Sequence, residues 1–359
     1  MTADLKTNFI IEKIKKSKLP QADFSNLVFG RMFSDHMLVA DYIDGQWQTP
    51  KIMPYQALPY EPSAKVFHYG QAIFEGMKAY KDQNGNAFLF RPEDNYERMN
   101  NSAQRLGMPA IPKEYFINGI KELIKLDKDW IPTGNGESLY IRPVFIATEN
   151  AVAASPSASY RFMVISSPAA KYYSGDVKVK IEDKYSRACD GGIGYAKAAG
   201  NYAAQFYPTE KAKAEGFQQI IWTDSAQHKY LEEAGTMNIF FRIGDKLLTA
   251  PTVPVSTRIL PGVTRRSVIQ LAKDNNIDVE VRPIEIAEVI EASKNGTLQE
   301  IFGAGTAATI LPIAGLKYKD YYADLPKLKD GFANKFKNML MDIQYNRVTD
   351  PYGWRVKID

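Results

Sequence analysis

The chain is poor in the residues that build disulfides and transition-metal sites. It has one cysteine, Cys189, so it can form no intrachain disulfide, and its three histidines, His36, His68 and His228, are far apart in the sequence. Zinc sites usually need closely spaced cysteine or histidine pairs. The sequence therefore argues against a transition metal held by protein ligands.

An excess of charge of one sign and long apolar runs are also missing. Lys plus Arg number 45 and Asp plus Glu 41, which leaves a formal net charge of +4 and no electrostatic reason to expect nucleic acid or a membrane as partner. No stretch approaches the ~20 apolar residues needed to span a bilayer. The N-terminal residues match neither a secretory signal nor a transit peptide, so we expect a cytoplasmic protein.

The composition that remains is that of a globular protein with mixed secondary structure. Hydrophobic residues make up 45% of the 359 residues and charged residues 24%, and this length predicts two domains. Apolar spacing predicts helices and strands in both halves, with a hairpin across Gly244-Asp245. We predict a smaller α/β domain over residues 1–170, a linker over 171–177 and a larger domain over 178–359.

One lysine stands in a stretch of small residues. Lys197 lies in the segment GGIGYAKAAG (191–200), which has no acidic residue. Small neighbours let a flat ligand approach the backbone, and a lysine in apolar surroundings can act as a nucleophile or a base. A flexible loop with one solvated lysine is the simpler interpretation and the more frequent one.

Two further segments have the size and chemistry to contact a phosphate. Residues 260–265 (LPGVTR) combine a glycine turn with Thr264, which can cap a following helix whose N–H groups face an anion. Residues 303–308 mimic the G-x-G-x-x-A dinucleotide fingerprint, but Pro312 comes too soon for the long helix that this fingerprint needs. We expect a tight, anion-contacting turn there. Each segment alone is more often an ordinary turn or capped helix.

Two adjacent carboxylates complete the set of candidates. Glu232 and Glu233 stand just before an apolar strand, so one of them can point inward, although a solvated strand end is the commoner case. One lysine, one buried carboxylate and two phosphate-sized turns together suit pyridoxal phosphate. That cofactor offers an aldehyde to the lysine, a pyridinium nitrogen to the acid and a phosphate to the turns.

Motifs from about residue 27 to residue 312 resemble the fold-type-IV aminotransferases and, within them, the branched-chain amino-acid aminotransferases. The matching segments are LVFGRMFSDHML (27–38), YGQAIFEGMKAY (69–80), FLFRP (88–92), YIRP (140–143), KAAGNY (197–202), EAGTMN (233–238), LPGVTR (260–265) and GAGTA (303–307). The resemblance implies a mixed α/β (α+β) fold similar to D-amino-acid aminotransferase. It has a mixed-sheet N-terminal domain and a larger C-terminal domain that binds pyridoxal phosphate.

The resemblance also implies the residues that hold the cofactor. Lys197 would bind it covalently, Glu233 would pair with the pyridine nitrogen, and Tyr202 would lie near the phenolic oxygen. The phosphate and the ring would be held by residues from several motifs, namely Arg91, Val263, Thr264, Thr306 and Gln219.

The substrate residues implied by the resemblance come from both halves of the chain. Tyr69 and the backbone at Thr306 and Ala307 would receive the substrate carboxylate, and Arg142 the distal carboxylate of glutamate. Four aromatic residues would wall the side-chain pocket: Phe29, Phe74, Tyr140 and Tyr172. The family works as a homodimer, and Tyr69 would be contributed across the interface.

The implied activity is reversible transfer of an amino group between leucine, isoleucine or valine and 2-oxoglutarate. A D-amino-acid transaminase, an amine transaminase or an aminodeoxychorismate lyase of the same fold is the nearest alternative. Outside this family we also consider a nicotinamide oxidoreductase built on residues 303–308 and a binder of phosphate ligands without catalysis.

Overall fold

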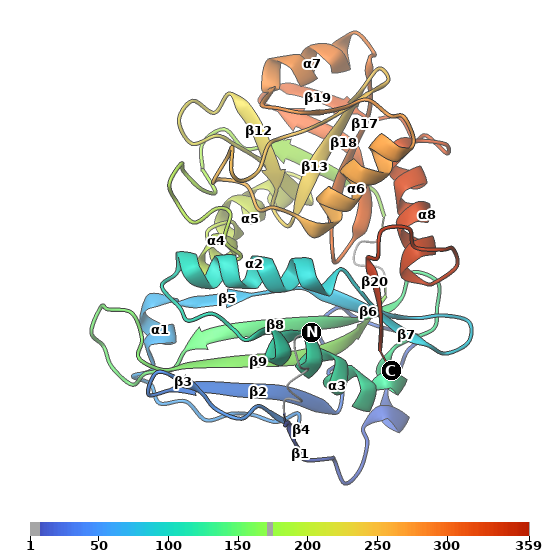
Figure 1. The fold of residues 1–359 in the computed structure, drawn as a ribbon. Helices are drawn as coiled ribbons and strands as arrows, with labels where there is room; N and C mark the ends of the chain where they lie inside the picture. Colours follow the sequence, from blue (N-terminus) through green and yellow to red (C-terminus); the bar gives the residue numbers. More distant parts are fainter. Residues whose placement is uncertain (1–7, 171–174, 359) are drawn as a thin grey trace. The chain divides into compact units, whose positions relative to one another are not determined.

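The structure is a computed structural model that describes residues 8–170 and 175–358. The chain divides into two compact units (Figure 1). Unit 1 comprises Met1–Tyr172 and Ile343–Asp359, and unit 2 comprises Tyr173–Asp342. Each unit is described by itself.

Unit 1 is built on one mixed sheet. Its strands follow the order β1-β4-β2-β9-β8-β6-β7-β20, with β3 paired to β2 and β5 to β8. The β1–β4 pair is parallel and the β8–β9 pair antiparallel. The strands are β1 (Ile10–Ile11), β2 (His36–Ile43), β3 (Gln46–Trp47), β4 (Lys51–Pro54), β5 (Ala72–Phe74), β6 (Met77–Lys81), β7 (Ala87–Phe90), β8 (Ser138–Ala147), β9 (Tyr160–Ala169) and β20 (Arg355–Ile358).

Helices cover this sheet where the sequence pattern predicts them. The strand at Phe88–Phe90 runs into α2 (Pro92–Arg105), which buries Met99 and Ala103, and Gly107 ends the helical stretch with φ +65°. The second predicted helix is a π-helical turn (Glu114–Asn118) followed by α3 (Gly119–Leu126). Its Phe116 ring stacks on Phe162 of β9 at 6.0 Å between centroids. The shorter helices are α1 (Lys65–Tyr69) and the 3-10 turns Leu19–Gln21 and Lys128–Trp130.

Unit 2 contains a sheet that closes on itself. The strand order is β15-β14-β13-β17-β18-β10-β11-β12-β16, with β19 on β18, and β12 also pairs with β13. Six strands therefore form a ring around a core that includes Val179, Ile221 and Phe241. The strands are β10 (Val177–Ile181), β11 (Gln219–Thr223), β12 (Tyr230–Ala234), β13 (Met237–Ile243), β14 (Lys246–Thr249), β15 (Val279–Val281), β16 (Ile284–Glu285), β17 (Leu298–Gly305), β18 (Thr309–Tyr318) and β19 (Tyr321–Asp324).

The connections of unit 2 follow the predicted pattern in most places. The hairpin of β13 and β14 turns at Gly244, whose φ is +57°. The strand predicted over residues 279–284 is interrupted at Arg282-Pro283, because proline lacks the N–H that a ladder needs. The helices are α4 (Ala199–Ala203), α5 (Phe206–Ala214), α6 (Val263–Asp274), α7 (Ile286–Lys294) and α8 (Phe332–Gln344). No helix of the described residues is long and apolar enough to cross a membrane.

The predicted domain limits need one correction. Residues 343–359 were expected in the second domain, but they belong to unit 1 because β20 pairs antiparallel with β7, where Val356 faces Leu89 (Figure 1). Of the predicted linker over residues 171–177, positions 171–174 lie outside the described residues, and Val177 already begins β10.

Candidate active site

Lys197 lies in the glycine-rich segment of unit 2, two residues before α4. It is half-buried, and its Nζ lies 2.7 Å from the hydroxyl of Tyr202, about one helical turn further along. Buried Asn201 donates hydrogen bonds to the carbonyls of Ile193 and Ala196 at 2.8 and 3.0 Å, which fixes the segment in front of the lysine. The structure thus brings two predicted site residues together and holds the loop that carries Lys197.

Glu233 lies on β12, with 4% of its surface exposed. Its Oε1 lies 2.8 Å from Nη1 of Arg187 and accepts the backbone N–H of Leu260 at 3.1 Å. Asn238 on the neighbouring β13 donates to Oε2 at 3.3 Å. Because a buried carboxylate is costly unless donors surround it, this cluster provides for an ionised glutamate.

Arg187 is a site residue that the sequence reasoning missed. The same Nη1 that contacts Glu233 also donates to the carbonyls of Gly194 and Arg258, at 3.0 and 2.8 Å. It therefore connects the carboxylate with the loop that carries Lys197. A buried glutamate needs a nearby cation, so the sequence signals that a basic residue lies close to Glu233. It does not identify Arg187 as that residue.

Glu232, the neighbour of Glu233, is also buried. The sequence predicted one inward-pointing carboxylate, and the structure buries both. Glu232 pairs with Nε of Arg258, which also pairs with Asp190. Burial raises the pKa of Glu232 to about 7, against the lowering effect of Arg258. Its Oε2 has no hydrogen-bond partner within the described part of the chain. The two glutamates therefore differ in how well they are satisfied.

The first predicted phosphate segment forms the start of α6. The helix begins at Val263, and Gly262 occupies the N-cap position, so Thr264 lies in the first turn and does not cap it, contrary to the expectation. A Cβ on Gly262 would lie 1.9 Å from Oδ1 of Asn238, so a glycine is required there. The first turn of a helix leaves N–H groups for an external acceptor.

The second predicted phosphate segment is a strand followed by a turn. Gly303–Gly305 continue β17, and the turn covers residues 306–308 before β18 returns antiparallel, so the predicted glycine turn is displaced by three residues. The glycines serve packing, since a Cβ on Gly303 would lie 2.1 Å from Sδ of Met237. No helix follows the segment, which excludes the dinucleotide fingerprint. Thr306 and Ala307 lie in the turn, half-buried.

Strand register places several of these residues on adjacent strands. Glu233 faces Asn238, and Asn238 faces Ala304, two residues before Thr306. Gln219 begins β11 and is buried, and a Cβ on Gly235 would lie 2.6 Å from its Oε1. One sheet of unit 2 thus carries Glu233, Gln219 and the strand that leads to Thr306.

The predicted pocket residues of unit 1 form an aromatic cluster around an arginine. Tyr140 and Arg142 point to the same face of β8, and Nη2 of Arg142 donates to the Tyr140 hydroxyl at 3.0 Å. The Arg142 guanidinium lies 4.7 Å from the ring centre of Phe74, and Phe29 meets Tyr140 edge-on at 4.8 Å. Nε of Arg142 is buried with no hydrogen-bond partner within residues 8–170 and 175–358.

Three predicted residues lie outside this cluster. Tyr69 ends α1, is 46% exposed, and donates its hydroxyl to the carbonyl of Val152. Arg91 precedes α2 with φ +52°, its Nε lies 2.6 Å from Asp94, and its guanidinium lies 4.8 Å from the ring of Trp354. Tyr172 falls outside the described residues.

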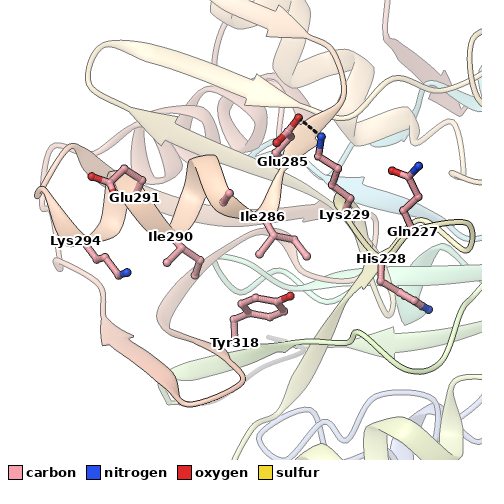
Figure 2. A pocket seen from close by; sticks show the side chains of 10 residues that line it. Gln227, His228, Lys229, Glu285, Ile286, Ile290, Glu291, Lys294 and Tyr318 are labelled. Atoms are coloured by element: carbon pink, nitrogen blue, oxygen red, sulfur yellow. Dashed lines mark ion pairs between the residues drawn. The ribbon is translucent and has the colours of Figure 1, made fainter.

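A cavity of about 620 Å³ in unit 2 contains none of the predicted residues (Figure 2). It is lined by the turn before β12, by α7 and by Tyr318. The described residues also hold no cluster of three or more His, Cys, Asp or Glu suited to a metal.

Comparison with known proteins places the chain in a family. The family model described as Amino-transferase class IV matches residues 72–316. The chain belongs to the class IV aminotransferases. This confirms the resemblance found in the motifs and the enzyme class that it implies.

Relatives and solved structures agree with this assignment. The chain is 43% identical to a probable branched-chain-amino-acid aminotransferase of Staphylococcus epidermidis, over 97% of this chain and 99% of the relative. Its fold is similar to that of the branched-chain amino acid aminotransferase of Escherichia coli, with TM-score 0.74, 22% identity, and coverage of 90% of this chain and 99% of that one. The PLP form of the Thermobaculum terrenum enzyme has TM-score 0.72 at 20% identity, covering 90% and 98%. These likenesses confirm the predicted fold class.

Proposed function

We propose that this class IV aminotransferase transfers amino groups reversibly between L-leucine, L-isoleucine or L-valine and 2-oxoglutarate. The observation that carries the proposal is the pairing of two features in unit 2. A lysine amine lies 2.7 Å from a tyrosine hydroxyl, and a buried glutamate lies 2.8 Å from a buried arginine. The name of the S. epidermidis relative supports the choice of substrates.

The residues of unit 2 fit pyridoxal phosphate as the cofactor. Lys197 offers an amine, Tyr202 a hydroxyl beside it, and buried Glu233 a carboxylate for a ring nitrogen. Gly262, where a Cβ would collide with Asn238, lets the first turn of α6 form a compact anion cradle. When bound, the cofactor would supply an electron sink for the substrate Cα.

Each of these residues would have its own role in the reaction. Glu233, ionised and held by Arg187, would keep a proton on the ring nitrogen. Lys197 would carry the proton to and from the substrate Cα, with the Tyr202 hydroxyl orienting its amine. Val263, Thr264 and Thr306 would hold the phosphate, together with Arg91 from unit 1, and Gln219 would lie beside the ring.

Unit 1 would supply substrate selection. Phe29, Phe74 and Tyr140 offer apolar surface for a branched side chain, and Arg142 offers a cation for the distal carboxylate of glutamate. One methylene changes binding by only ~1–3 kcal/mol in an apolar pocket, so the three branched substrates should overlap.

The remaining contacts would require a homodimer. Tyr69 is 46% exposed and donates its hydroxyl to the carbonyl of Val152, and an exposed position suits a role across a subunit interface. There it would bind the substrate carboxylate together with the backbone at Thr306 and Ala307. Tyr172 stays a predicted wall residue, and the cytoplasmic location stays a prediction.

The visible spectrum of the purified enzyme tests the proposal. The wild type should show a yellow band that L-leucine bleaches, and Lys197→Ala should lack it. A protein that stays colourless after addition of pyridoxal phosphate would contradict the cofactor assignment.

The stereochemistry of the substrate separates the alternatives of the same fold. L-Leucine with 2-oxoglutarate should turn over, and D-leucine should not. Activity with D-amino acids or amines only, or loss of pyruvate from aminodeoxychorismate, would replace the proposal with one of those activities.

A further inference from the structure

A second cavity of unit 2, of about 300 Å³, lies beside the start of α6 but shares no residue with the candidate active site. Its walls come from the loop after β14, the end of β15 and one side chain of α6. They comprise two arginines, Arg265 and Arg282, one threonine, Thr252, and six apolar residues: Pro251, Val253, Pro254, Val255, Val281 and Pro283.

Arg265 is the unusual member of this lining. Only 4% of its surface is exposed, and its guanidinium donates to Oγ1 of Thr249 at 3.3 Å and to the carbonyl of Ala250 at 2.7 Å through Nε and Nη2. Its Nη1 has no hydrogen-bond partner, and the guanidinium has no carboxylate in ion-pair contact, within the described residues. Burial lowers the pKa of Arg265 to about 10, and Glu233, already paired with Arg187, compensates only in part.

Arg282 provides the contrast within the same cavity. Its guanidinium contacts Glu280 at 2.8 Å and Glu288 at 2.5 Å, so its charge is fully balanced. Arg265 is therefore the cation of this lining that can still accept an anion. A guanidinium binds carboxylates through paired N–H donors, and such charge-assisted bonds are stronger than those between neutral groups.

The rest of the wall favours a hydrocarbon next to that anion. Val253, Val255 and Val281 are 36%, 77% and 46% exposed, so their side chains present apolar surface at the cavity. The three prolines restrict the backbone, so little conformational freedom would be lost when a ligand binds.

We propose that this cavity binds a small aliphatic monocarboxylate, with the carboxylate on Nη1 of Arg265 and the hydrocarbon against the valines and prolines. The ligand class combines one negative charge with an apolar body, as the cavity combines one unbalanced cation with apolar walls. The cavity shares no lining residue with the candidate active site, and the proposal does not depend on the function proposed above.

The 620 Å³ cavity of Figure 2 does not support a comparable proposal. Its Lys229 is already paired with Glu285 at 2.7 Å, and its other charged side chains, Glu291 and Lys294, are exposed. It has no buried cation or anion that a ligand would have to balance.

Titration of the cofactor-loaded enzyme with 3-methylbutanoate tests the proposal, since Val255 allows a matched pair of variants. Val255→Asp places a negative charge at the rim and should weaken one binding event by about tenfold or more. Val255→Asn changes polarity without charge and should stay within about threefold. Val255 is 77% exposed, so both variants should fold, and both should keep the wild-type KM for L-leucine.

A crystal of the wild type soaked with 4-bromobutanoate locates the site directly. An anomalous bromine peak among the valines, with the carboxylate on Arg265, supports the proposal. A peak confined to the region of Lys197, equal affinities of the Asp and Asn variants, or displacement of the compound by an equal concentration of chloride would overturn it. Arg265→Gln should abolish the second binding event, and wild-type affinity in that variant, if it folds, would also overturn the proposal.

Discussion

The two units carry chemically opposite groups of predicted site residues. In unit 2, the amine of Lys197 bonds to the hydroxyl of Tyr202 at 2.7 Å, and Glu233 forms an ion pair with Arg187 at 2.8 Å. In unit 1, Phe29, Phe74 and Tyr140 surround Arg142 mainly through ring contacts of 4.7–5.3 Å. The unit 2 network has directional bonds and fixed charges, whereas the unit 1 cluster consists of adaptable surfaces.

This difference predicts a division between chemistry and selectivity. When one partner of a buried charged pair is removed, the protein loses function sharply, because the remaining charge is left uncompensated. Aromatic walls tolerate change more gradually, since each contact is small. Substitutions in the Lys197–Tyr202 and Glu233–Arg187 pairs should therefore slow turnover for every substrate, and substitutions in the aromatic cluster of unit 1 should change the ranking of substrates.

The largest effect is expected at Glu233. Glu233→Gln keeps the shape of the side chain but removes the charge that would hold a proton on the ring nitrogen, so kcat should fall by about 10²–10⁴ for all substrates. Single-turnover kinetics with leucine and with glutamate measure the accompanying fall in the rate of each half-reaction. Glu232→Gln is the matched control on the same strand and should leave kcat near the wild-type value. Equal losses in both variants would remove the assignment of Glu233.

The next effect is expected at Arg187. Arg187→Met leaves Glu233 buried without its cation, which should lower the free energy of unfolding by about 3–5 kcal/mol. Chemical denaturation measures the change. Adding Glu233→Gln to Arg187→Met should restore part of the stability, because no uncompensated charge then remains. A double variant as unstable as the sum of the single variants would show that the pair is not coupled.

The sequence predicted the parts of this molecule that depend on local spacing. Met99 and Ala103 follow a helical period and are buried on α2, and Gly244 turns the predicted hairpin with a positive φ. The final segment was assigned to the wrong domain because the pairing of β20 with β7 joins distant parts of the chain. Nothing in the local pattern of residues 355–358 identifies the strand that they pair with.

The candidate active site shows the same limit of prediction from local sequence patterns. The motifs predicted Lys197, Tyr202 and Glu233 as site residues, and the structure brings the first two together. Arg187 was missed because its role arises from folding, which places its guanidinium against both Glu233 and the carbonyl of Gly194. Thr264 was assigned as a cap because helix starts are uncertain by one or two residues in a sequence.

The buried carboxyl of Glu232 should make the stability of the protein depend on pH. Its pKa of about 7 lies above the ordinary value, because burial disfavours the carboxylate. Between about pH 5 and pH 7 the folded protein therefore holds a proton that the unfolded chain has released, and stability falls as the pH rises. Glu232→Gln lacks this titration, so its stability relative to the wild type should increase by about 3 kcal/mol from pH 5 to pH 8.

Denaturation at several pH values measures this change. Glu291→Gln, at an exposed glutamate of α7, serves as the control and should follow the wild type throughout. If the stability of Glu232→Gln relative to the wild type is the same at pH 5 and pH 8, the carboxyl of Glu232 does not titrate in that range.

The smallest effect, and the one that most sharply separates the two units, is expected at Arg142. Arg142→Met keeps the length and apolar contact of the side chain against Phe74 and Tyr140 but removes the cation. The half-reaction with glutamate should slow by about tenfold to a hundredfold, because a charge-assisted bond to its distal carboxylate is lost. The half-reaction with leucine, which has no second carboxylate, should change by less than about threefold. Stopped-flow measurement of the two half-reactions gives the ratio, and Arg142→Lys should restore part of the glutamate rate. Equal slowing of both half-reactions would mean that Arg142 supports the chemistry itself, and the division between the two units would then fail.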